Sequence, residues 1–482
     1  MADISNISRR NILRGAAIGA GGALLIPYIS KAQSSYSSMR PAPSARKFRS
    51  KAVDAAIDAA GAKLRDPELG WLFSNCLPNT LDTTVRFGEF AGKPDTVVVT
   101  GDIPAMWLRD SSAQVWPYLS FVSQDADLAR LIEGIIRRQT RCILVDPYAN
   151  AFMPDLTDPK PLEWSVHDET EMKPGVGERK WEIDSLCYPV RLAHRYWKET
   201  QDSGPFNHEW TAAMHRIVET FKAQQRKNSR GPYSFRRSSA SPTDTLSGDG
   251  FGNPARPVGL IYAGFRPSDD ACVYPLNIPG NFFAVQTLMR LEEMFTELAH
   301  DATAAREAAN LAVEIKQALG AHSQLRHDTF GDILAYEIDG YGNAIFMDDA
   351  NVPGLLAMPY LGTCTASDPI YQATRKFLLS ESNPYFFKGS AAEGIGGPHI
   401  GQDMIWPMSI IMRAMTSEDP HEQVQCLRWL KSTHAGTGFM HESFNKDDPR
   451  KFTRAWFAWA NTLFGELILT VEKKSPGLLS EV

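Results

Sequence analysis

Acidic residues of this chain recur in short stretches together with aromatic residues, arginine or histidine. The stretches are GDIPAMWLRD at 101–110, HDE at 167–169, WEIDSLCYP at 181–189, GFRPSDD at 264–270, YEID at 336–339, DDAN at 348–351, GGPHIGQD at 396–403 and GTGFMHESF at 436–444. Carboxylate and guanidinium groups bind sugar hydroxyls in pairs, and Trp or Tyr rings pack on the C–H faces of a pyranose. Together these residue types predict a site for a polyhydroxylated ligand.

Two carboxyl groups at such a site are sufficient to hydrolyse a glycosidic bond. One must be protonated to donate to the leaving oxygen, and the other must be ionised to act on water or on the anomeric carbon. Each candidate also has an ordinary interpretation. Asp184 could cap a helix, Asp269 and Asp270 could form a solvated turn after Pro267, and Glu442 could be an acidic residue of a loop. The residues alone leave these alternatives open.

The WLRD stretch suits binding better than proton transfer. Arg109 and Asp110 either form an ion pair at the start of a helix or grip the hydroxyls of a ligand. Asp102 and Trp107 would then extend over the rim of the site, with the indole packing on or behind a sugar ring. We therefore interpret this stretch as a clamp for a terminal pyranose.

The elements that must position these residues are helical. Apolar residues at three- and four-residue spacing predict twelve stretches, near 51–64, 111–122, 126–142, 183–200, 207–226, 278–298, 302–319, 353–361, 368–380, 401–416, 420–433 and 455–472. Connections of about three to six residues alternate with connections of about 17 to 50 along the whole chain. An all-α ring of six antiparallel hairpins produces this alternation, since every second connection returns to the same rim. Long loops usually carry function, so the decorated rim is the predicted site.

The N-terminal residues are separate from this ring. SRRNILR at 8–14 precedes a weakly apolar run, interrupted by glycines and Pro27, that is shorter than the roughly 20 residues of a membrane span. This pattern is typical of a twin-arginine export signal. We predict a cleaved signal at 1–32, a flexible leader at 33–47, one domain at 48–475 and a tail at 476–482. The exported protein is then periplasmic or secreted, without stable membrane association.

Composition excludes several classes of function. The chain has 50 Lys and Arg against 56 Asp and Glu, and removing residues 1–32 leaves a net charge of −9, so there is no basic surplus for nucleic acid. Six cysteines without CxxC pairs predict mainly buried free thiols rather than a zinc site or a disulfide framework. His167, Asp168 and Glu169 are consecutive and would point in different directions, so we expect no metal site there.

Five longer motifs carry a family resemblance over residues 50 to 472. They are GDIPAMWLRDSSAQVWPYL, IDSLCYPVRLA, FRPSDDACVYPLNIPGN, KGSAAEGIGGPHIGQDMIWPMS and GTGFMHESFNKDDPRKFTRAWFAWANTLFGELI. Together they resemble glycoside hydrolase family 125, which are exo-acting α-1,6-mannosidases. The resemblance implies an (α/α)6 barrel, inversion of anomeric configuration, release of terminal α-1,6-linked mannose, and no metal or other cofactor.

The resemblance also assigns the two carboxyl groups. Glu442 of the HES motif corresponds to the general base. The general acid corresponds to the paired Asp of RPSDDAC, where we favour Asp269 over Asp270 and keep Asp184 in reserve. Asp269 belongs to the third long loop and Glu442 to the sixth, so in a ring of six hairpins they should face each other. A nearby Asp270 carboxylate would raise the pKa of Asp269 and keep it protonated.

Further side chains are expected to hold the sugar. They are Asp102, Trp107, Arg109, Asp110, Asp184, Asp270, Asn277, His399, Gln402 and His441. The expected partner is a mannose-containing oligosaccharide, and we expect a monomer. Two other functions stay open, because a fold does not determine a reaction: a hydrolase or lyase for another glycan linkage, or a non-catalytic exported glycan-binding protein.

Overall fold

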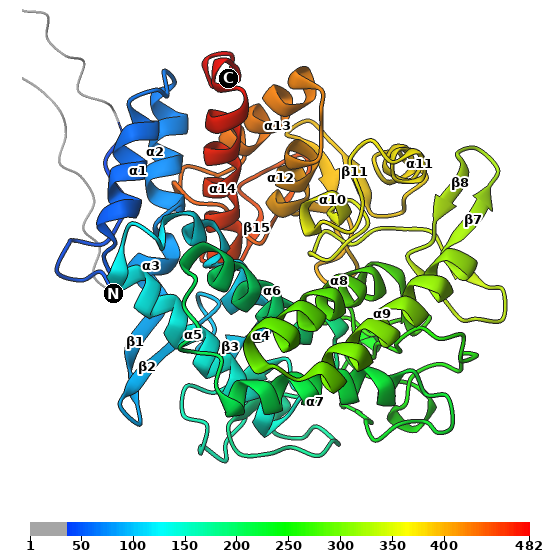
Figure 1. The fold of residues 1–482 in the computed structure, drawn as a ribbon. Coiled ribbons are helices and arrows are strands. Elements are labelled where there is room, and N and C mark those ends of the chain that lie inside the picture. The colour runs from blue at the N-terminus through cyan, green and yellow to red at the C-terminus, as the bar shows by residue number, and fades with distance from the viewer. Residues whose placement is uncertain (1–35) are drawn as a thin grey trace, which may run out of the picture. The chain divides into compact units, whose positions relative to one another are not determined.

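The helices of this protein form two layers around a common axis. The structure is a computed structural model that describes residues 36–482 (Figure 1). The predicted export signal and residues 33–35 of the predicted leader lie outside the described residues. Chain order runs around the ring, and the N-terminal helices α1 (Lys51–Gly61) and α2 (Pro67–Cys76) lie beside the C-terminal helix α14 (Ala458–Lys474), which closes it (Figure 1).

Six helices form the inner layer of an (α/α)6 barrel, and the chain enters each of them from a long loop. They are α4 (Leu108–Ala113), α6 (Ile183–Thr200), α8 (Ile278–Met294), α10 (Met358–Leu361), α12 (Pro407–Met415) and α14. α4 packs against α6, α6 against α8, and α14 against both α12 and α4. All residues of α4 and most of α14 are buried, as expected for helices with protein on every side.

The outer layer consists of amphipathic helices. Besides α1 and α2 it contains α5 (Ala126–Val145), α7 (His208–Gln224), α9 (Ala302–His322), α11 (Pro369–Leu378) and α13 (Pro420–Ser432). α5 buries Leu128, Leu131, Ile132 and Ile135, which recur at helical spacing on the face that meets the inner layer. Each of the helices α5, α7, α9, α11 and α13 follows an inner helix after a short link. The predicted alternation of short and long connections is therefore confirmed.

The two layers begin differently. A side chain caps the N-terminus of each outer helix by accepting a backbone N–H; these residues are Ser50, Asp66, Asp125, Asn207, Asp301, Asp368 and Asp419. Among the six inner helices, only α8 has such a cap, which Asn277 supplies. The other five begin without one. Their backbone N–H groups and positive dipole ends therefore face the long-loop rim without a local partner.

Short antiparallel strands fix the long loops next to the helix starts. The strands are β1 (Val85–Phe90), β2 (Lys93–Val98), β3 (Met106–Trp107), β4 (Ala151–Phe152), β5 (Val176–Glu178), β6 (Leu276–Asn277), β7 (Gln324–His327), β8 (Gly331–Leu334), β9 (Glu337–Ile338), β10 (Ala344–Ile345), β11 (Phe386–Lys388), β12 (Glu393–Ile395), β13 (Met404–Ile405), β14 (Ser443–Asn445) and β15 (Phe452–Thr453). Three-stranded sheets in the orders β3-β4-β5, β10-β9-β6 and β13-β14-β15 each join two successive long loops. β1–β2, β7–β8 and β11–β12 are hairpins. Because β3 and β6 run directly into α4 and α8, these sheets hold the loop backbones at the rim.

Several short helical elements complete the chain. They are α3 (Asn79–Thr83), η1 (Trp116–Phe121), η2 (Glu163–Ser165), η3 (Pro242–Asp244), η4 (Gly248–Gly250), the π-turn η5 (Phe295–Ala299) and η6 (Pro476–Ser480). The sequence analysis missed α2 and α3, although Asp66 followed by Pro67 is a helix-start signal. The predicted tail is also part of the fold, because η6 packs on α13 and α14 and buries Leu479.

Residues 36–47 differ from the prediction of a flexible leader. Tyr36 stacks on Trp71 with 5.0 Å between ring centroids, and Arg40 Nε donates to Asp82 Oδ2 at 2.7 Å. The segment is rich in Ser and Pro, which suggested flexibility, but these two side chains fix it to α2 and α3. The ordered domain therefore begins before residue 48.

Two further expectations concern helices and cysteines. Within residues 36–482, no helix is both long enough and apolar enough to cross a membrane. All six cysteines lie in this part of the chain and are free thiols, of which all but the partly exposed Cys364 are buried. The prediction of mainly buried free thiols is confirmed.

Gly134 provides a test of how closely α5 approaches β2. A Cβ at this position would lie 2.4 Å from Thr96 Oγ1. Alanine normally stabilises a helix interior relative to glycine by ~1 kcal/mol. Here we expect Gly134→Ala to destabilise the protein by about 1–3 kcal/mol, because the added methyl overlaps the strand.

Gly320 in α9 is the matched control, since a Cβ there meets no atom within 4 Å. Gly320→Ala should raise the midpoint of thermal unfolding while Gly134→Ala lowers it. Calorimetry of both variants makes the comparison, and a higher midpoint for Gly134→Ala would contradict the close packing.

Candidate functional site

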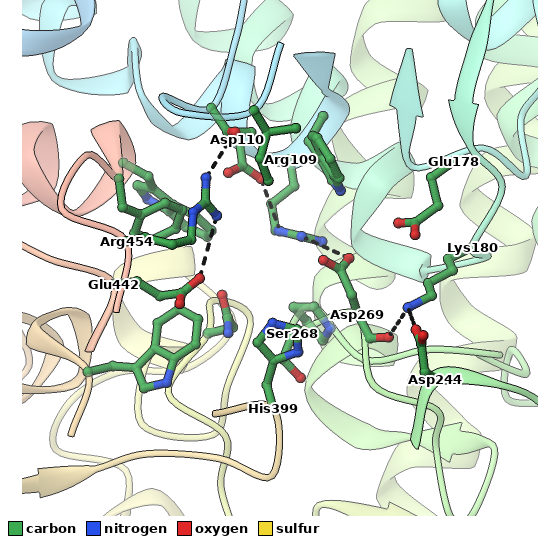
Figure 2. Close-up of a pocket in the computed structure, with 18 of the residues that line it drawn as sticks. Arg109, Asp110, Glu178, Lys180, Asp244, Ser268, Asp269, His399, Glu442 and Arg454 are labelled. Carbon is green, nitrogen blue, oxygen red and sulfur yellow. Dashed lines mark hydrogen bonds and ion pairs between the residues drawn. The ribbon is translucent and has the colours of Figure 1, made fainter. Parts of the chain in front are cut away.

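A cavity of about 280 Å³ lies at the long-loop rim, and all six long loops contribute to its wall (Figure 2). The wall consists of Thr100, Ile103, Trp107, Arg109, Asp110, Trp164, Glu178, Lys180, Arg237, Asp244, Pro267, Ser268, Asp269, Asn351, His399, Trp406, Glu442, Arg454, Phe457 and Trp459. The residues of this wall that the sequence predicted are Trp107, Arg109, Asp110, Asp269, His399 and Glu442. The structure therefore brings together side chains that are distant in sequence.

Arg109, at the start of α4, contacts four carboxyl groups. Its Nη1 lies 2.5 Å from Glu182 Oε2 and 3.4 Å from Asp184 Oδ2. Its Nη2 lies 3.5 Å from Asp269 Oδ1, and its Nε lies 3.4 Å from Asp110 Oδ2. The guanidinium is buried, so loss of one partner would leave charge without compensation. Arg109 is thus the centre of an ionic cluster rather than a free clamp for hydroxyls.

Asp269 occupies a tight turn. Its φ is 67°, in the left-handed region, and the turn is closed by a β-bridge between Phe265 and Ala271. Asn150 Nδ2 donates to Asp269 Oδ1 at 3.2 Å, and Lys180 Nζ donates to the Asp269 carbonyl at 2.8 Å. Asp tolerates this backbone conformation better than most residues. The turn and these contacts fix the carboxyl group at the cavity wall.

Glu442 lies opposite Asp269 across the cavity (Figure 2). Its carboxylate accepts hydrogen bonds from Thr453 Oγ1 at 2.9 Å and from Arg454 Nη1 at 3.5 Å. Arg454 Nε also donates to Asp102 at 2.9 Å. Asp102 therefore orients Arg454 from outside the wall instead of reaching the ligand, as the sequence had suggested.

The carboxyl group beside Asp269 is that of Glu182, not that of Asp270. The carboxylate of Asp270 accepts from Ser268 Oγ at 3.4 Å and lies 3.8 Å from His399 Nδ1. The left-handed turn directs these two consecutive side chains to different partners. The expectation that Asp270 raises the pKa of Asp269 is therefore wrong. Asp269 instead shares two donors with Glu182: Arg109 contacts both carboxyl groups, and Asn150 Nδ2 lies 3.2 Å from Asp269 Oδ1 and 3.4 Å from Glu182 Oε1.

Glu182 and Asp269 together retain a proton, because Glu182 is fully buried and two ionised carboxylates that share the same donors repel each other. Burial raises the pKa of Glu182 well above its usual range; Arg109 opposes this, and the charges of Asp269 and Asp184 add to it. Burial also opposes ionisation of Asp269, but Arg109, the contact with Glu182 and Lys180 outweigh it, so the pKa of Asp269 is lowered. The shared proton lies on the Glu182 side of the pair.

His399 brings a positive charge to the cavity. Partial desolvation by the surrounding wall disfavours its imidazolium form, but the carboxylate of Asp270 at 3.8 Å and the charges of Asp269 and Glu442 outweigh it and raise the pKa of His399 to about 9. At neutral pH the ring is therefore a cation that faces both of the predicted catalytic carboxyl groups (Figure 2).

Sequence analysis missed the polar side chains on the Asp269 side of the cavity. Lys180 Nζ donates to Asp244 Oδ1 at 2.6 Å, and Arg237 Nη2 donates to Glu178 Oε1 at 2.9 Å. Trp164 Nε1 also donates to Glu178, and 46% of this tryptophan is exposed. Glu178 and Lys180 directly precede the WEID stretch, which could have drawn attention to them. Arg237 and Asp244 lie in a loop without any recognisable motif.

Besides Asp102 and Asp270, four further predicted binding residues do not reach the cavity wall. Asp184 is buried behind Arg109, and Asn277 caps α8 by accepting from Gly280 N at 2.9 Å. Gln402 is exposed on the surface of its loop. His441 is stacked on Phe452 at 3.8 Å between ring centroids, facing away from the cavity as neighbours in an extended segment do.

The HDE stretch does not form a metal site. Asp168 pairs with Arg237 at 2.7 Å, Glu169 bridges to the backbone of Arg236, and His167 is exposed. Over residues 36–482, no three His, Cys, Asp or Glu side chains are grouped as a metal would require.

Comparisons with known proteins agree on one family. A family model described as "Metal-independent alpha-mannosidase (GH125)" matches residues 66–469. The meiotically up-regulated gene 157 protein of Schizosaccharomyces pombe is 43% identical over 461 residues, which cover 92% of this chain and 90% of that protein.

Solved structures give the same result. One is of Streptococcus pneumoniae origin, from a family of metal-independent α-mannosidases, in a non-productive substrate complex with α-1,6-mannobiose. It is 41% identical, with a TM-score of 0.85, and the match covers 89% of this chain and 100% of that one. A glucoamylase from Saccharomycopsis fibuligera matches at 12% identity and a TM-score of 0.53, over 90% of this chain and 98% of its own, which is a likeness of fold alone.

The contact between His399 and Asp270 predicts an unusual titration. Nitrogen NMR of the imidazole rings should show His399 titrating near pH 9, whereas burial lowers the pKa of His441 to about 4. Asp270→Asn should move the pKa of His399 toward its ordinary value of about 6.5. The stabilisation from this pair is complete below pH ~6.5 and is lost as the pH rises through the folded-state pKa. Ordinary titration of His399 in the unmodified protein would contradict the pairing.

Proposed function

Because the chain belongs to glycoside hydrolase family 125, the metal-independent α-mannosidases, we propose that it removes terminal α-1,6-linked mannose with inversion. The observation that carries the proposal is the position of Asp269 and Glu442 on opposite sides of one cavity (Figure 2). An inverting hydrolase needs an acid and a base on opposite faces of the sugar, with room for water beside the base. The cavity is also small, near the lower end of the ~300–1,000 Å³ of ligand pockets, which favours a chain end.

In the proposed reaction Asp269 is the general acid and Glu442 the general base. Asp269 gives its proton to the glycosidic oxygen while the bond from C1 to that oxygen breaks and leaves its electron pair there. Glu442 takes a proton from a water molecule whose oxygen forms the new bond to C1 from the opposite face. The hydroxyl of Thr453 and the guanidinium of Arg454 both donate to Glu442, so they hold it as an acceptor.

The sugar itself is bound by aromatic and polar groups of the wall. Trp107, Trp406 and Trp459 supply apolar faces for the C–H groups of the ring. Asp110 and His399 supply an acceptor and a charged donor for hydroxyls. Arg109 acts indirectly, since its donors already serve the carboxyl groups around it.

The α-1,6 linkage and the exo action rest on family membership and on the relatives. The pneumococcal structure contains α-1,6-mannobiose, which supports the same linkage here. The substrate in this proposal is a mannose-containing oligosaccharide or glycan that presents such a chain end.

We further propose that residues 1–32 direct export by the twin-arginine route. The Arg9-Arg10 pair, the weakly apolar run and the small residues at its end support this. The mature protein then acts as a periplasmic or secreted monomer without stable membrane association.

Substitution of either catalytic carboxyl group tests the assignment. Asp269→Asn and Glu442→Gln should each lower kcat on α-1,6-mannobiose by about 100- to 10,000-fold, because each removes one proton transfer. Asp403→Asn is a matched control: this residue also has a left-handed φ, of 64°, but it pairs with Lys446 and does not line the cavity. Mannose release is measured after circular dichroism has verified folding. Unimpaired turnover by a folded variant would remove that residue from the mechanism.

A screen of mannobioses tests substrate and stereochemistry together. We expect α-1,6-mannobiose to be cleaved at least ~10-fold faster than the α-1,2, α-1,3 and α-1,4 isomers, because cleavage requires the glycosidic oxygen at the acid. Proton NMR should show β-mannose as the first-formed anomer. First-formed α-mannose would indicate retention, an unsaturated product would indicate a lyase, and binding without release would indicate a glycan-binding protein.

A further inference from the structure

Glu182 is a completely buried carboxyl group that the reaction, as described so far, does not use. It precedes the first turn of α6, has no exposed surface and does not line the cavity. Its position next to Asp269 is fixed by donors that serve both groups. Arg109 contacts Glu182 through Nη1 and Asp269 through Nη2. Asn150 Nδ2 lies 3.4 Å from Glu182 Oε1 and 3.2 Å from Asp269 Oδ1.

A helix-capping function does not account for Glu182. Its side chain makes no capping hydrogen bond to the backbone of α6. Instead, Ser185 Oγ donates to Glu182 Oε2 at 2.9 Å, and Oε1 lies beside the Asn150 amide that also donates to Asp269. A carboxyl group that only balanced the charge of Arg109 would not need this second shared donor, and Asp184 contacts the same guanidinium.

We propose that Glu182 is a positioning residue that keeps one proton on the Glu182–Asp269 pair, so that Asp269 can act as the general acid. This inference rests on the function proposed above. Glu182 has no exposed surface, and the two carboxyl groups share Arg109 and Asn150, which disfavours ionisation of both at the same time. Without Glu182, the cations around Asp269 would leave it ionised and unable to donate.

The charged and titratable groups around the pair come from several elements. They are Arg109 and Asp110 of α4, Asp184 of α6, Glu178 and Lys180 of the preceding segment, Cys272 of the third loop and His399 of the fifth. The three cations among them lower the pKa of Asp269. Glu182 shares Arg109 and Asn150 with Asp269, so its carboxyl group is positioned to hold the proton that Asp269 does not keep.

The proton balance of a turnover is simple. The pair begins with one proton, which passes from Glu182 to Asp269. The O–H bond of Asp269 then breaks as the leaving oxygen takes the proton and the electron pair of its bond to C1. Glu442 gains one proton from the attacking water. After product release, Glu442 returns a proton to solvent and the pair takes one up, so the enzyme is restored.

Glu182→Gln tests the proposal through the leaving group and the pH profile. Gln keeps the size of Glu and one of its two acceptor oxygens but carries neither the charge nor the exchangeable acid proton. We expect kcat on α-1,6-mannobiose to fall by about 100-fold or more, as for loss of acid catalysis. The basic limb of the profile should move down by at least about one pH unit, because Asp269 then loses its proton more readily. On α-mannosyl fluoride, whose leaving group needs no proton, the variant should stay within about fivefold of the unmodified protein.

Two variants serve as controls. Ser185→Ala removes only a donor to Glu182, so the pair should hold its proton more tightly and the basic limb should move up, by about half a unit. Asp184→Asn removes a charge beside Arg109 but leaves the Glu182–Asp269 pair intact. The ratio of the activity on α-1,6-mannobiose to the activity on α-mannosyl fluoride should therefore stay unchanged. Deprotonation of His399 would change the activity on both substrates alike. Comparing α-1,6-mannobiose with α-mannosyl fluoride therefore separates an effect of His399 from an effect of the Glu182–Asp269 pair.

The outcomes distinguish this inference from the function on which it rests. If the unmodified protein does not release mannose from α-1,6-mannobiose, the proposed function fails. If it does, but Glu182→Gln loses both activities equally and keeps the basic limb, Glu182 only balances the charge of Arg109 and the inference is overturned. If Glu182→Gln does not fold, the Ser185→Ala profile decides: an upward shift on mannobiose alone supports the inference, and an unchanged limb overturns it.

Discussion

The arrangement of the site depends on one buried guanidinium that is surrounded by carboxyl groups from different loops. Arg109 begins an inner helix, Glu182 and Asp184 begin the next, and Asp269 belongs to the third long loop. A buried charge that loses its partner costs several kcal/mol, so each loop is stable in this position only when the others are present. Folding of the rim and the geometry of the acid are therefore determined by the same cluster.

The ends of the inner helices explain why carboxyl groups collect at this rim. α4, α6, α12 and α14 begin beside the cavity without a side-chain cap, so their terminal N–H groups and positive dipole ends favour negative charge there. The outer helices satisfy the same need locally, with a capping Ser, Asp or Asn at every start. The uncapped helix starts therefore favour anions at one face of the barrel. The long loops at that face supply the acidic side chains.

Capping also explains how much of this protein could be predicted from its sequence. α5, α9 and α13 begin where predicted because an Asp precedes each, whereas α10, α12 and α14, which lack a cap, begin three to six residues later. α6 is the exception, since it lacks a cap and still begins at the predicted residue, Ile183. The opposition of Asp269 and Glu442 followed from loop order, which needs only the ring topology. The contacts of Glu182 with Asp269, and of Arg454 with Glu442, depend on side-chain directions in loops that have no regular period.

Asp269 and Glu442 lie in the same cavity and differ mainly in the side chains that contact each carboxyl group. Both lie at the wall of one cavity, and His399 places a positive charge near both, which favours ionisation of each and cannot distinguish them. Glu442 receives two further donors, which suit a carboxylate. Asp269 faces Arg109 as well, so a second acidic group is needed if it is to carry a proton at all. A carboxyl group out of reach of the ligand meets that need, because it acts on the acid without competing for the sugar.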